Sequence, residues 1–378
     1  MKKPLTLILT IIICVAVFPL VASAEILIPP GFLAPIEPIP DDVREENIVR
    51  VNNENIRNID WFQAGKYYIL TEDIDLSDEE WVPIGYESGA TAFIGVFDGR
   101  GHVIRNMTIT GDYRIAGFFW NADFSEIKNI GFENIYINVS SSETVTLVGG
   151  IAAGSRDTVI SNCYMTGDIY ANSENGVEAA GLVGYSVGLV FMNCFNAANI
   201  SAIAIGSTDV VYANAGGIFC GSSLIVDNCL NTGNIYASGE DVSHAGGIAH
   251  FNVYTEETAF IKNSYNIGNI SAKTNKDDGH AVAGGIVAFN IPDVQIISCY
   301  WSINAEQIIN GVPRTDVEKR GIGSGYDHTT SLTTAEILDK FNLVEPDTDV
   351  APKTGVTLPL LPLIFIGVMR VSADRKKK

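Results

Sequence analysis

One phrase returns along this chain, and it constrains the fold more than any other feature. Residues 162–170 read NCYMTGDIY, with close copies at 193–201, 228–236 and 263–271 and a partial copy at 298–301. A glycine phrase such as AGGI precedes each copy. Its second glycines follow one another at spacings of 31, 36, 30 and 38 residues: Gly150, Gly181, Gly217, Gly247 and Gly285. A period of this length indicates a solenoid or a propeller, in which each unit packs on its neighbours.

Within each unit the pattern favours strands over helices. Three short apolar runs are separated by Gly and Asn, and each run is too short for a stable helix. Three strands in a coil of about 30 residues predict an all-β fold, a right-handed parallel β-helix with short capping helices at either end. Successive coils would lie about 4.8 Å apart.

Stacking the copies turns each position of the phrase into a column. The first column holds Asn162, Asn193, Asn228 and Asn263. The second holds Cys163, Cys194, Cys229, Ser264 and Cys299. A third column holds Asp168, Asn199, Asn234 and Asn269. Asparagine tolerates left-handed backbone and its amides can bond from coil to coil, while cysteine serves as a small core residue that serine can replace. We interpret the columns as structural, because catalysis has no use for four equivalent copies.

The two ends of the chain differ from the repeats. The first 24 residues have the pattern of a secretory signal peptide: a charged start at Lys2 and Lys3, an apolar run, and a small-residue cleavage site at Ala22-Ser23-Ala24. Apolar spacing suggests a short helix at 51–63, and Thr333 and Glu336 have the spacing of a capping box at the start of a helix at 333–341. The predicted layout is a signal peptide at 1–24, a Pro/acid-rich linker at 25–50, a β-helix at 51–305 with a possible N-terminal cap at 51–65, a C-terminal cap at 306–344, a wall linker at 345–355, and an apolar segment with a basic tail at 356–378.

The C-terminal residues carry a first family resemblance. The pentapeptide consists of Ala351, Pro352, Lys353, Thr354 and Gly355. An apolar stretch that is short for a spanning helix and a basic tail follow it. This arrangement resembles the cell-wall sorting signal of Gram-positive surface proteins, with Ala351 in place of the usual leucine. The resemblance implies that a sortase cuts between Thr354 and Gly355 and joins the chain to peptidoglycan. It also implies an extracellular, wall-anchored protein that meets the membrane only transiently, through its C-terminal segment.

Charge and cysteine content exclude several classes of function. The formal net charge is −20, and both terminal segments are basic, so the chain without them is more acidic still. Such a surface repels nucleic acid, which we therefore exclude as a partner. Of the six cysteines, Cys14 lies in the signal peptide. The odd number that remains argues against a complete disulfide framework.

A second resemblance covers residues 60–305. GLVG at Gly181–Gly184 resembles the GLUG motif, GVFDGRGHVIRNMTI at 95–109 resembles the entry coil that precedes such repeats, and 65–85 resembles the lead-in. These repeats occur in bacterial surface β-helices and in IgA-specific metallopeptidases. The last glycine of the motif is replaced in five copies, by Trp120, Ala153, Cys220, His250 and Ala288. The chain has no His-Glu-x-x-His sequence, so the resemblance does not extend to protease activity.

The loops before each glycine phrase vary most. Insertions at one repeat position gather on one edge of a solenoid, so we expect loops 238–244 and 273–282 to be neighbours. Their polar residues fit either solvated turns or a calcium site, and no other cofactor is expected. The candidate ligands are Asp241, His244, Asp277, Asp278 and His280.

These features together predict a non-catalytic surface protein. Its expected function is adhesion or the binding of an extracellular glycan, polymer or protein ligand. One alternative is a carbohydrate-active enzyme, either a polysaccharide lyase or a hydrolase, and another is a passive stalk. Such enzymes need paired carboxylates on one face, and the repeat period brings no such pair together on a strand, so no catalytic residue is assigned.

Overall fold

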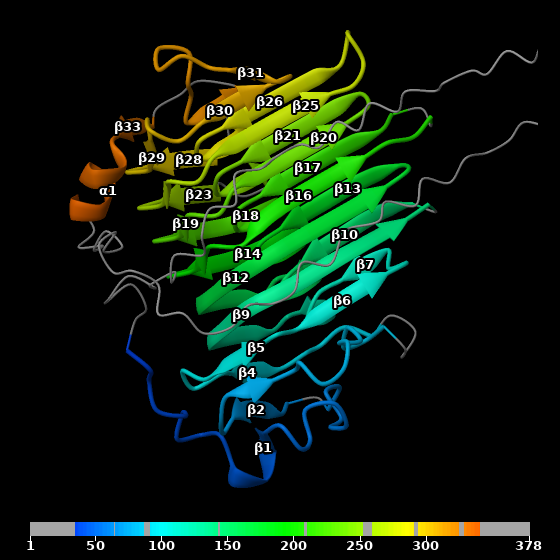
Figure 1. Ribbon diagram of the computed structural model, residues 1–378. Helices are drawn as coiled ribbons and strands as arrows, with labels where there is room; N and C mark the ends of the chain where they lie inside the picture. Colours follow the sequence, from blue (N-terminus) through cyan, green and yellow to red (C-terminus); the bar gives the residue numbers. More distant parts are fainter. Residues whose placement is uncertain are drawn as a thin grey trace, which may run out of the picture. The chain divides into compact units, whose positions relative to one another are not determined.

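The computed structural model describes residues 35–340, apart from 64, 87–90, 143, 208–209, 252–258, 291–293 and 325–328. Within these residues the chain is almost entirely β and forms a parallel β-solenoid of about eight turns (Figure 1). The predicted all-β parallel β-helix is therefore confirmed. The predicted signal peptide, the sorting signal at 351–355 and the segment at 356–378 lie outside the described residues. In the described part, no helix has the length and apolarity that crossing a membrane requires.

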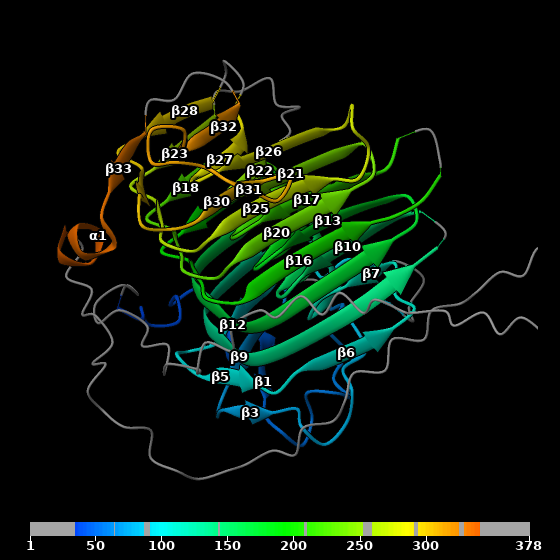
Figure 2. The same ribbon diagram turned by 45° about the horizontal axis from the view of Figure 1, so that its top comes forward.

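Two sheets contain all the strands of the described residues. The smaller sheet takes one strand from each of six successive coils (Figure 2). Its members are β7 (Ile115–Ala116), β10 (Val145–Gly149), β13 (Gly176–Ala180), β17 (Tyr212–Gly216), β21 (Val242–Gly246) and β26 (His280–Gly284). The larger sheet consists of β1 (Ile48–Val51), β2 (Tyr67–Leu70), β3 (Ile74–Asp75), β4 (Val96–Asp98), β5 (Val103–Arg105), β6 (Thr108–Gly111), β8 (Phe119–Asp123), β9 (Glu126–Ser141), β11 (Ala152–Arg156), β12 (Val159–Ser173), β14 (Val183–Met192), β15 (Phe195–Asn196), β16 (Asn199–Ala204), β18 (Phe219–Asp227), β19 (Leu230–Asn231), β20 (Ile235–Gly239), β22 (Ala249–Phe251), β23 (Ala259–Lys262), β24 (Tyr265–Asn266), β25 (Ile270–Thr274), β27 (Val287–Phe289), β28 (Val294–Ile297), β29 (Tyr300–Ser302), β30 (Gln307–Ile309), β31 (Val312–Pro313), β32 (Ile322–Ser324) and β33 (Thr330–Leu332).

A single coil has more strands than the sequence suggested. The coil made by β17, β18, β19 and β20 pairs in parallel with β21 to β25 of the next coil. Three strands per coil were expected, but the residues before the glycine phrase and the pair after Asn-Cys form strands of their own. Because these strands pair with their equivalents one coil away, residues at one repeat position lie in a continuous column.

Inward-facing apolar residues build the core. Ile137, Ile169, Ile200, Ile235 and Ile270 pair in register through successive coils and are buried. Burying an isoleucine side chain contributes about 1.5–3 kcal/mol, which a coil gains only by stacking on its neighbours.

The first asparagine column behaves as predicted. Asn162, Asn193, Asn228 and Asn263 all have left-handed backbone, with φ between 49° and 53°. Asn193 Nδ2 donates to Asn162 Oδ1 at 3.2 Å, and Asn228 Nδ2 donates to Asn193 Oδ1 at 2.8 Å. Asn263 does not continue this series of amide bonds, because its Nδ2 donates to Asp227 Oδ1 instead of to Asn228. The third column is bonded likewise, from Asn199 to Asp168 and from Asn234 to Asn199.

The cysteine column also matches its predicted role. Cys163, Cys194, Cys229 and Cys299 are buried and free, and Ser264 is buried in the same column. Burial raises the pKa of the Cys163 and Cys229 thiols well above the ordinary value. A buried thiol of this kind is unreactive, which supports a packing role.

A third asparagine ladder, buried in the core, was not anticipated. Asn196, Asn231 and Asn266 lie inside the solenoid and are at most 1 % exposed. Asn196 Nδ2 donates to Asn231 Oδ1, and Asn231 Nδ2 donates to Asn266 Oδ1, both at 2.7 Å. The glycine phrase makes room for them, because a Cβ at Gly181 or Gly217 would overlap both the next glycine's carbonyl oxygen and an asparagine side chain. Glycine is therefore required there for close approach.

Both predicted end regions need correction. Residues 53–58 form consecutive turns instead of a helix, and Asn52 and Asn55 exchange side-chain-to-backbone hydrogen bonds at the start of these turns. Strand β1 begins at Ile48, inside the predicted linker. At the other end, β30, β32 and β33 stack on β25, β27 and β29, so the solenoid continues beyond residue 305.

The C-terminal helix and its cap were predicted correctly. Helix α1 spans Thr334–Lys340. Thr333 and Glu336 exchange the hydrogen bonds of a capping box. Ile337 and Leu338 join a small apolar cluster with residues such as Leu230.

Candidate functional site

The predicted calcium ligands are only partly brought together. The two loops are neighbours, since β21 pairs with β26. His244 Nε2 lies 3.3 Å from His280 Nδ1, but Asp241 is engaged elsewhere: one of its oxygens pairs with Lys276 and the other accepts the Val211 backbone N–H. Asp277 and Asp278 are exposed. Calcium binding at this edge stays a prediction.

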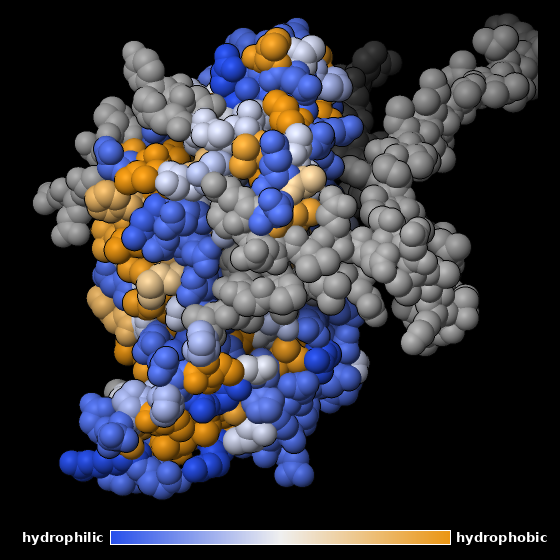
Figure 3. Space-filling model, turned by 90° about the vertical axis from the view of Figure 1, so that its left-hand side faces the viewer, coloured by the Kyte–Doolittle hydropathy of each residue, from blue (hydrophilic) through white to orange (hydrophobic). Residues whose placement is uncertain are grey.

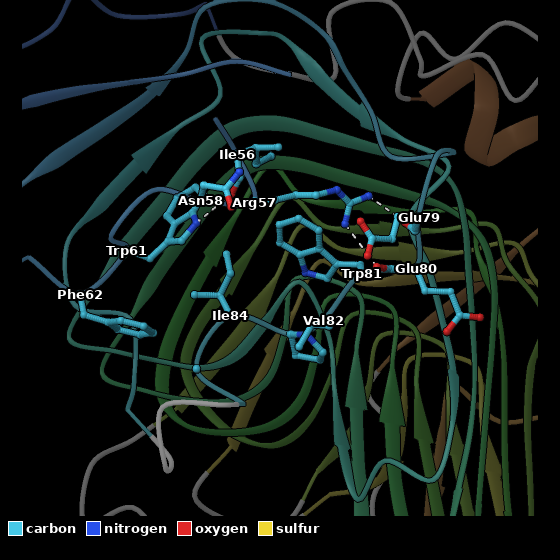
Figure 4. A pocket seen from close by; sticks show the side chains of 12 residues that line it. Ile56, Arg57, Asn58, Trp61, Phe62, Glu79, Glu80, Trp81, Val82 and Ile84 are labelled. Atoms are coloured by element: carbon cyan, nitrogen blue, oxygen red, sulfur yellow. Dashed lines mark hydrogen bonds between the residues drawn. The ribbon is translucent and has the colours of Figure 1, made fainter. Parts of the chain in front are cut away.

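A pocket of about 540 Å³ opens near the N-terminal turns (Figure 4). Trp61 and Phe62 line one side, Trp81 and Val82 the other, and Ile84 lies between them. The indoles are only 4 % and 3 % exposed, and each donates its N–H to a backbone carbonyl. Neither indole has a ring face free to stack on a ligand, so the pocket offers no aromatic platform.

Two of its charged residues, Arg57 and Glu80, are also engaged. The Arg57 guanidinium lies over Trp81 and donates to the Asp78 carboxylate and to two backbone carbonyls. Glu80 accepts a hydrogen bond from the Thr110 hydroxyl. The Arg57 side chain thus closes one end of the pocket, and we read the region as part of the N-terminal packing.

Exposed tyrosines and amides occupy the outer face of β9, β12, β16, β20 and β25, the strands stacked on one another in Figure 2. We call this surface the tyrosine–asparagine face. Tyr136 and Tyr170 are 36 % and 40 % exposed, and their ring centroids lie 6.0 Å apart. Tyr170 pairs with Ser201, which pairs with Tyr236, so these two tyrosines stand two strands apart, or about 10 Å. Asp168 and the amides of the third column line the same face.

Elsewhere the surface is mixed. On the side of the molecule drawn in Figure 3, apolar residues reach the surface as separate patches divided by hydrophilic ones. The tyrosine–asparagine face is thus distinguished by its regular order rather than by its apolarity.

A buried polar cluster lies where the smaller sheet meets β18 and β22. Two columns of paired residues form the cluster. The first contains Glu178 on β13, Asn214 on β17 and His244 on β21. In the second, Cys220 on β18 pairs with His250 on β22. Strand neighbours of these residues belong to the core cluster: Val177, Ala179, Ala213, Ala245, Phe219 and Ala249. Because side chains alternate along a strand, the polar residues point away from the core and meet outside it.

Three of these side chains converge within the cluster. Potential ligand atoms of Glu178, Cys220 and His250 lie within 4.8 Å of one another. The residues are 6 %, 0 % and 4 % exposed. His250 Nδ1 lies 3.6 Å from Glu178 Oε2, which is too far for a hydrogen bond, and among the described residues neither atom has a hydrogen-bond partner.

The groups around these atoms are well ordered. Asn214 Nδ2 donates to Glu178 Oε1 at 2.9 Å, and Cys220 Sγ lies 3.3 Å from the Ala179 carbonyl oxygen. His244 Nδ1 lies 3.2 Å from His250 Nε2. Burial and the neighbouring imidazoles of His250 and His280 lower the pKa of His244 to about 3. Burial and the charge of Glu178 raise the pKa of the Cys220 thiol well above its ordinary value. His244 is therefore neutral, and without further interactions the Cys220 thiol keeps its proton.

Sequence reasoning missed this cluster although the signal was present. Cys220 and His250 stand where the ideal repeat has its last glycine, and they do so in consecutive coils. Taken copy by copy, these substitutions mark only departures from the motif. Comparing them along the column, instead of within each copy, would have placed a thiol opposite an imidazole.

Comparisons with known proteins bear on the fold. No family model matches the chain, and no curated protein matches it. The chain is similar to the crystal structure of a putative immunoglobulin A1 protease from Bacteroides ovatus, with 21 % identity, 77 % of this chain and 85 % of that chain covered, and a TM-score of 0.54. An IgA1 protease structure matches with 12 % identity, 85 % of this chain and 25 % of that chain covered, and a TM-score of 0.36. The first similarity supports the β-solenoid fold.

Proposed function

We propose that the chain is a non-catalytic surface protein that binds an extracellular glycan along its tyrosine–asparagine face. The observation that carries the proposal is a series of tyrosines among columns of amide side chains, in which Tyr136 and Tyr170 are exposed and Tyr236 is half-buried. Tyrosine rings pack on the apolar faces of sugars, and amides donate to and accept from hydroxyls. A flat face that repeats along the solenoid suits a polymer better than a small molecule.

We further propose that the protein is displayed on a Gram-positive cell wall. The support for this part is the sequence alone: the signal peptide at 1–24, the Pro-Lys-Thr-Gly sequence ending at Gly355 and the basic tail. Thr354→Ala should move the protein from the wall fraction to the membrane or the medium. Unchanged wall attachment would contradict the proposed sorting signal.

A glycan array tests the binding face. The secreted protein should bind a limited set of polysaccharides, and a Tyr170→Ala, Tyr236→Ala variant should lose most of that binding. Tyr185→Ala is the matched control, because Tyr185 is 41 % exposed but belongs to β14 on another face. Equal loss in the control would contradict the assignment of the face. Binding to no glycan would favour a passive stalk, and release of shortened products would favour the carbohydrate-active enzyme.

A further inference from the structure

We propose that Glu178, Cys220 and His250 bind one divalent transition-metal ion of the zinc class. The ligand atoms would be Glu178 Oε2, Cys220 Sγ and His250 Nδ1. This site is independent of the proposed glycan face, since it lies on β13, β18 and β22.

The first argument is that two polar atoms are buried without hydrogen bonds. Glu178 Oε2 and His250 Nδ1 face each other in a region closed to solvent. Leaving a buried polar atom unsatisfied is costly, and native proteins rarely do so without a reason such as an unseen ion. One ion between the two atoms would satisfy both.

The second argument is geometric. Tetrahedral zinc lies about 2.0–2.3 Å from oxygen, nitrogen and sulfur ligands, so its ligand atoms are about 3.3–3.7 Å apart. The 3.6 Å between His250 Nδ1 and Glu178 Oε2 already has this value. Cys220 Sγ completes a triangle whose members all lie within 4.8 Å, which small side-chain rotations can close.

Surrounding residues hold two of the ligands in the required orientation. Asn214 occupies Glu178 Oε1 and leaves Oε2 turned toward the cluster. His244 Nδ1 lies 3.2 Å from His250 Nε2, so in the tautomer that donates Nε2–H to His244 the lone pair of His250 lies on Nδ1. Hydrogen bonds of this kind to the outer atoms of metal ligands are typical of metal sites.

The donor set selects the kind of metal. A thiolate and an imidazole favour zinc and its neighbours over calcium or magnesium, which prefer oxygen. Binding breaks the Cys220 S–H bond, the proton leaves to solvent and the sulfur electron pair forms the bond to the metal. A thiolate, a carboxylate, a neutral imidazole and a divalent cation sum to zero charge, which makes burial of the complex favourable.

A chain of imidazoles connects the cluster to the surface. His280 is exposed, His244 is half-buried and His250 is 4 % exposed. The His244 and His250 rings stack with centroids 5.2 Å apart. Imidazole nitrogens bind zinc-class ions transiently as well as permanently, so this series provides a route for entry.

Cobalt(II) provides a direct test on the full chain, because cobalt bound to a thiolate absorbs in the near ultraviolet. The metal-free protein should take up one equivalent of Co²⁺ with a thiolate-to-cobalt band, and Zn²⁺ should displace it. Zinc should also raise the melting temperature by several degrees, and calcium should not reproduce either effect. Absence of the band would overturn the proposal.

Substitutions of single residues test which side chains bind the ion. Cys220→Ala should abolish the band, whereas Cys229→Ser, which alters a buried thiol outside the cluster, should keep it. Glu178→Gln preserves shape and should weaken cobalt binding at least tenfold, with far-ultraviolet circular dichroism confirming that each variant folds. If Cys220→Ala fails to fold, the Glu178→Gln titration decides. A full-strength band in Cys220→Ala, or a cobalt affinity of Glu178→Gln equal to that of the wild type, would contradict the assignment.

Discussion

Cys220 lies directly opposite His250 in the parallel pairing of β18 with β22. At the equivalent point of the preceding coil the chain has Gly184, the residue of the ideal repeat. The pair therefore places a thiol and an imidazole side by side in a column that has only glycine or alanine in the coils on either side, at Gly184 and Ala288. The buried cluster thus arises where the chain departs from its repeat.

The buried ladder should be essential for stability. Asn231→Ala removes the acceptor of Asn196 Nδ2 and the donor to Asn266 Oδ1, and leaving buried groups unsatisfied costs about 1–3 kcal/mol each. Urea unfolding should show this loss. Asn234→Ala, in the exposed column, should cost less than about 1 kcal/mol. Equal losses would mean that burial of the ladder does not matter.

The cysteine column should tolerate oxygen in place of sulfur. Cys229→Ser should fold and lose about 1 kcal/mol, because Ser264 shows how a hydroxyl in this column donates to the carbonyl two residues before it. Thermal melts with and without reductant should coincide, since the described cysteines are free. A drop of many degrees on adding reductant would contradict the packing role.

Alkaline pH should destabilise the fold through its buried tyrosines. Burial and the nearby Glu133 carboxylate, which accepts a hydrogen bond from the Tyr164 hydroxyl at 2.6 Å, raise the pKa of Tyr164. The unfolded chain releases this proton from about pH 10, while the folded chain keeps it, so stability falls as pH rises above about 10. Tyr164→Phe should flatten the slope of unfolding free energy against pH by up to about 1.4 kcal/mol per pH unit. An unchanged slope would exclude Tyr164 as a contributor.

Calcium binding at the loop edge can be tested separately from the buried cluster. If Asp277 and Asp278 bind calcium, calcium at 100 times its dissociation constant should add about 2.7 kcal/mol of stability. Calorimetric titration of the wild type and of an Asp277→Asn, Asp278→Asn variant should show heat only in the former. Equal heats, or none in either, would leave these loops as solvated turns.

The repeat period was enough to predict the stacked strands, the left-handed asparagines and the buried thiols. These follow from local chemistry repeated in register. The turns at 53–58 were misread because the apolar spacing there resembles that of a helix, while the hydrogen bonds between Asn52 and Asn55 are visible only in three dimensions. Convergence of Glu178 with Cys220 and His250 depends on the angle between two sheets, which a column alignment does not contain.

The buried asparagine ladder also has defined ends. Its column begins after Met165, which pairs with Asn196, and stops at Trp301, which pairs with Asn266. A complete coil inserted between these limits could join the ladder if it had asparagine at this position and glycine in the preceding phrase. A coil inserted after Trp301 would meet an indole instead of an amide. Whole coils can therefore be added or removed between Met165 and Trp301 without ending the ladder, and related solenoids should differ in coil number within this interval.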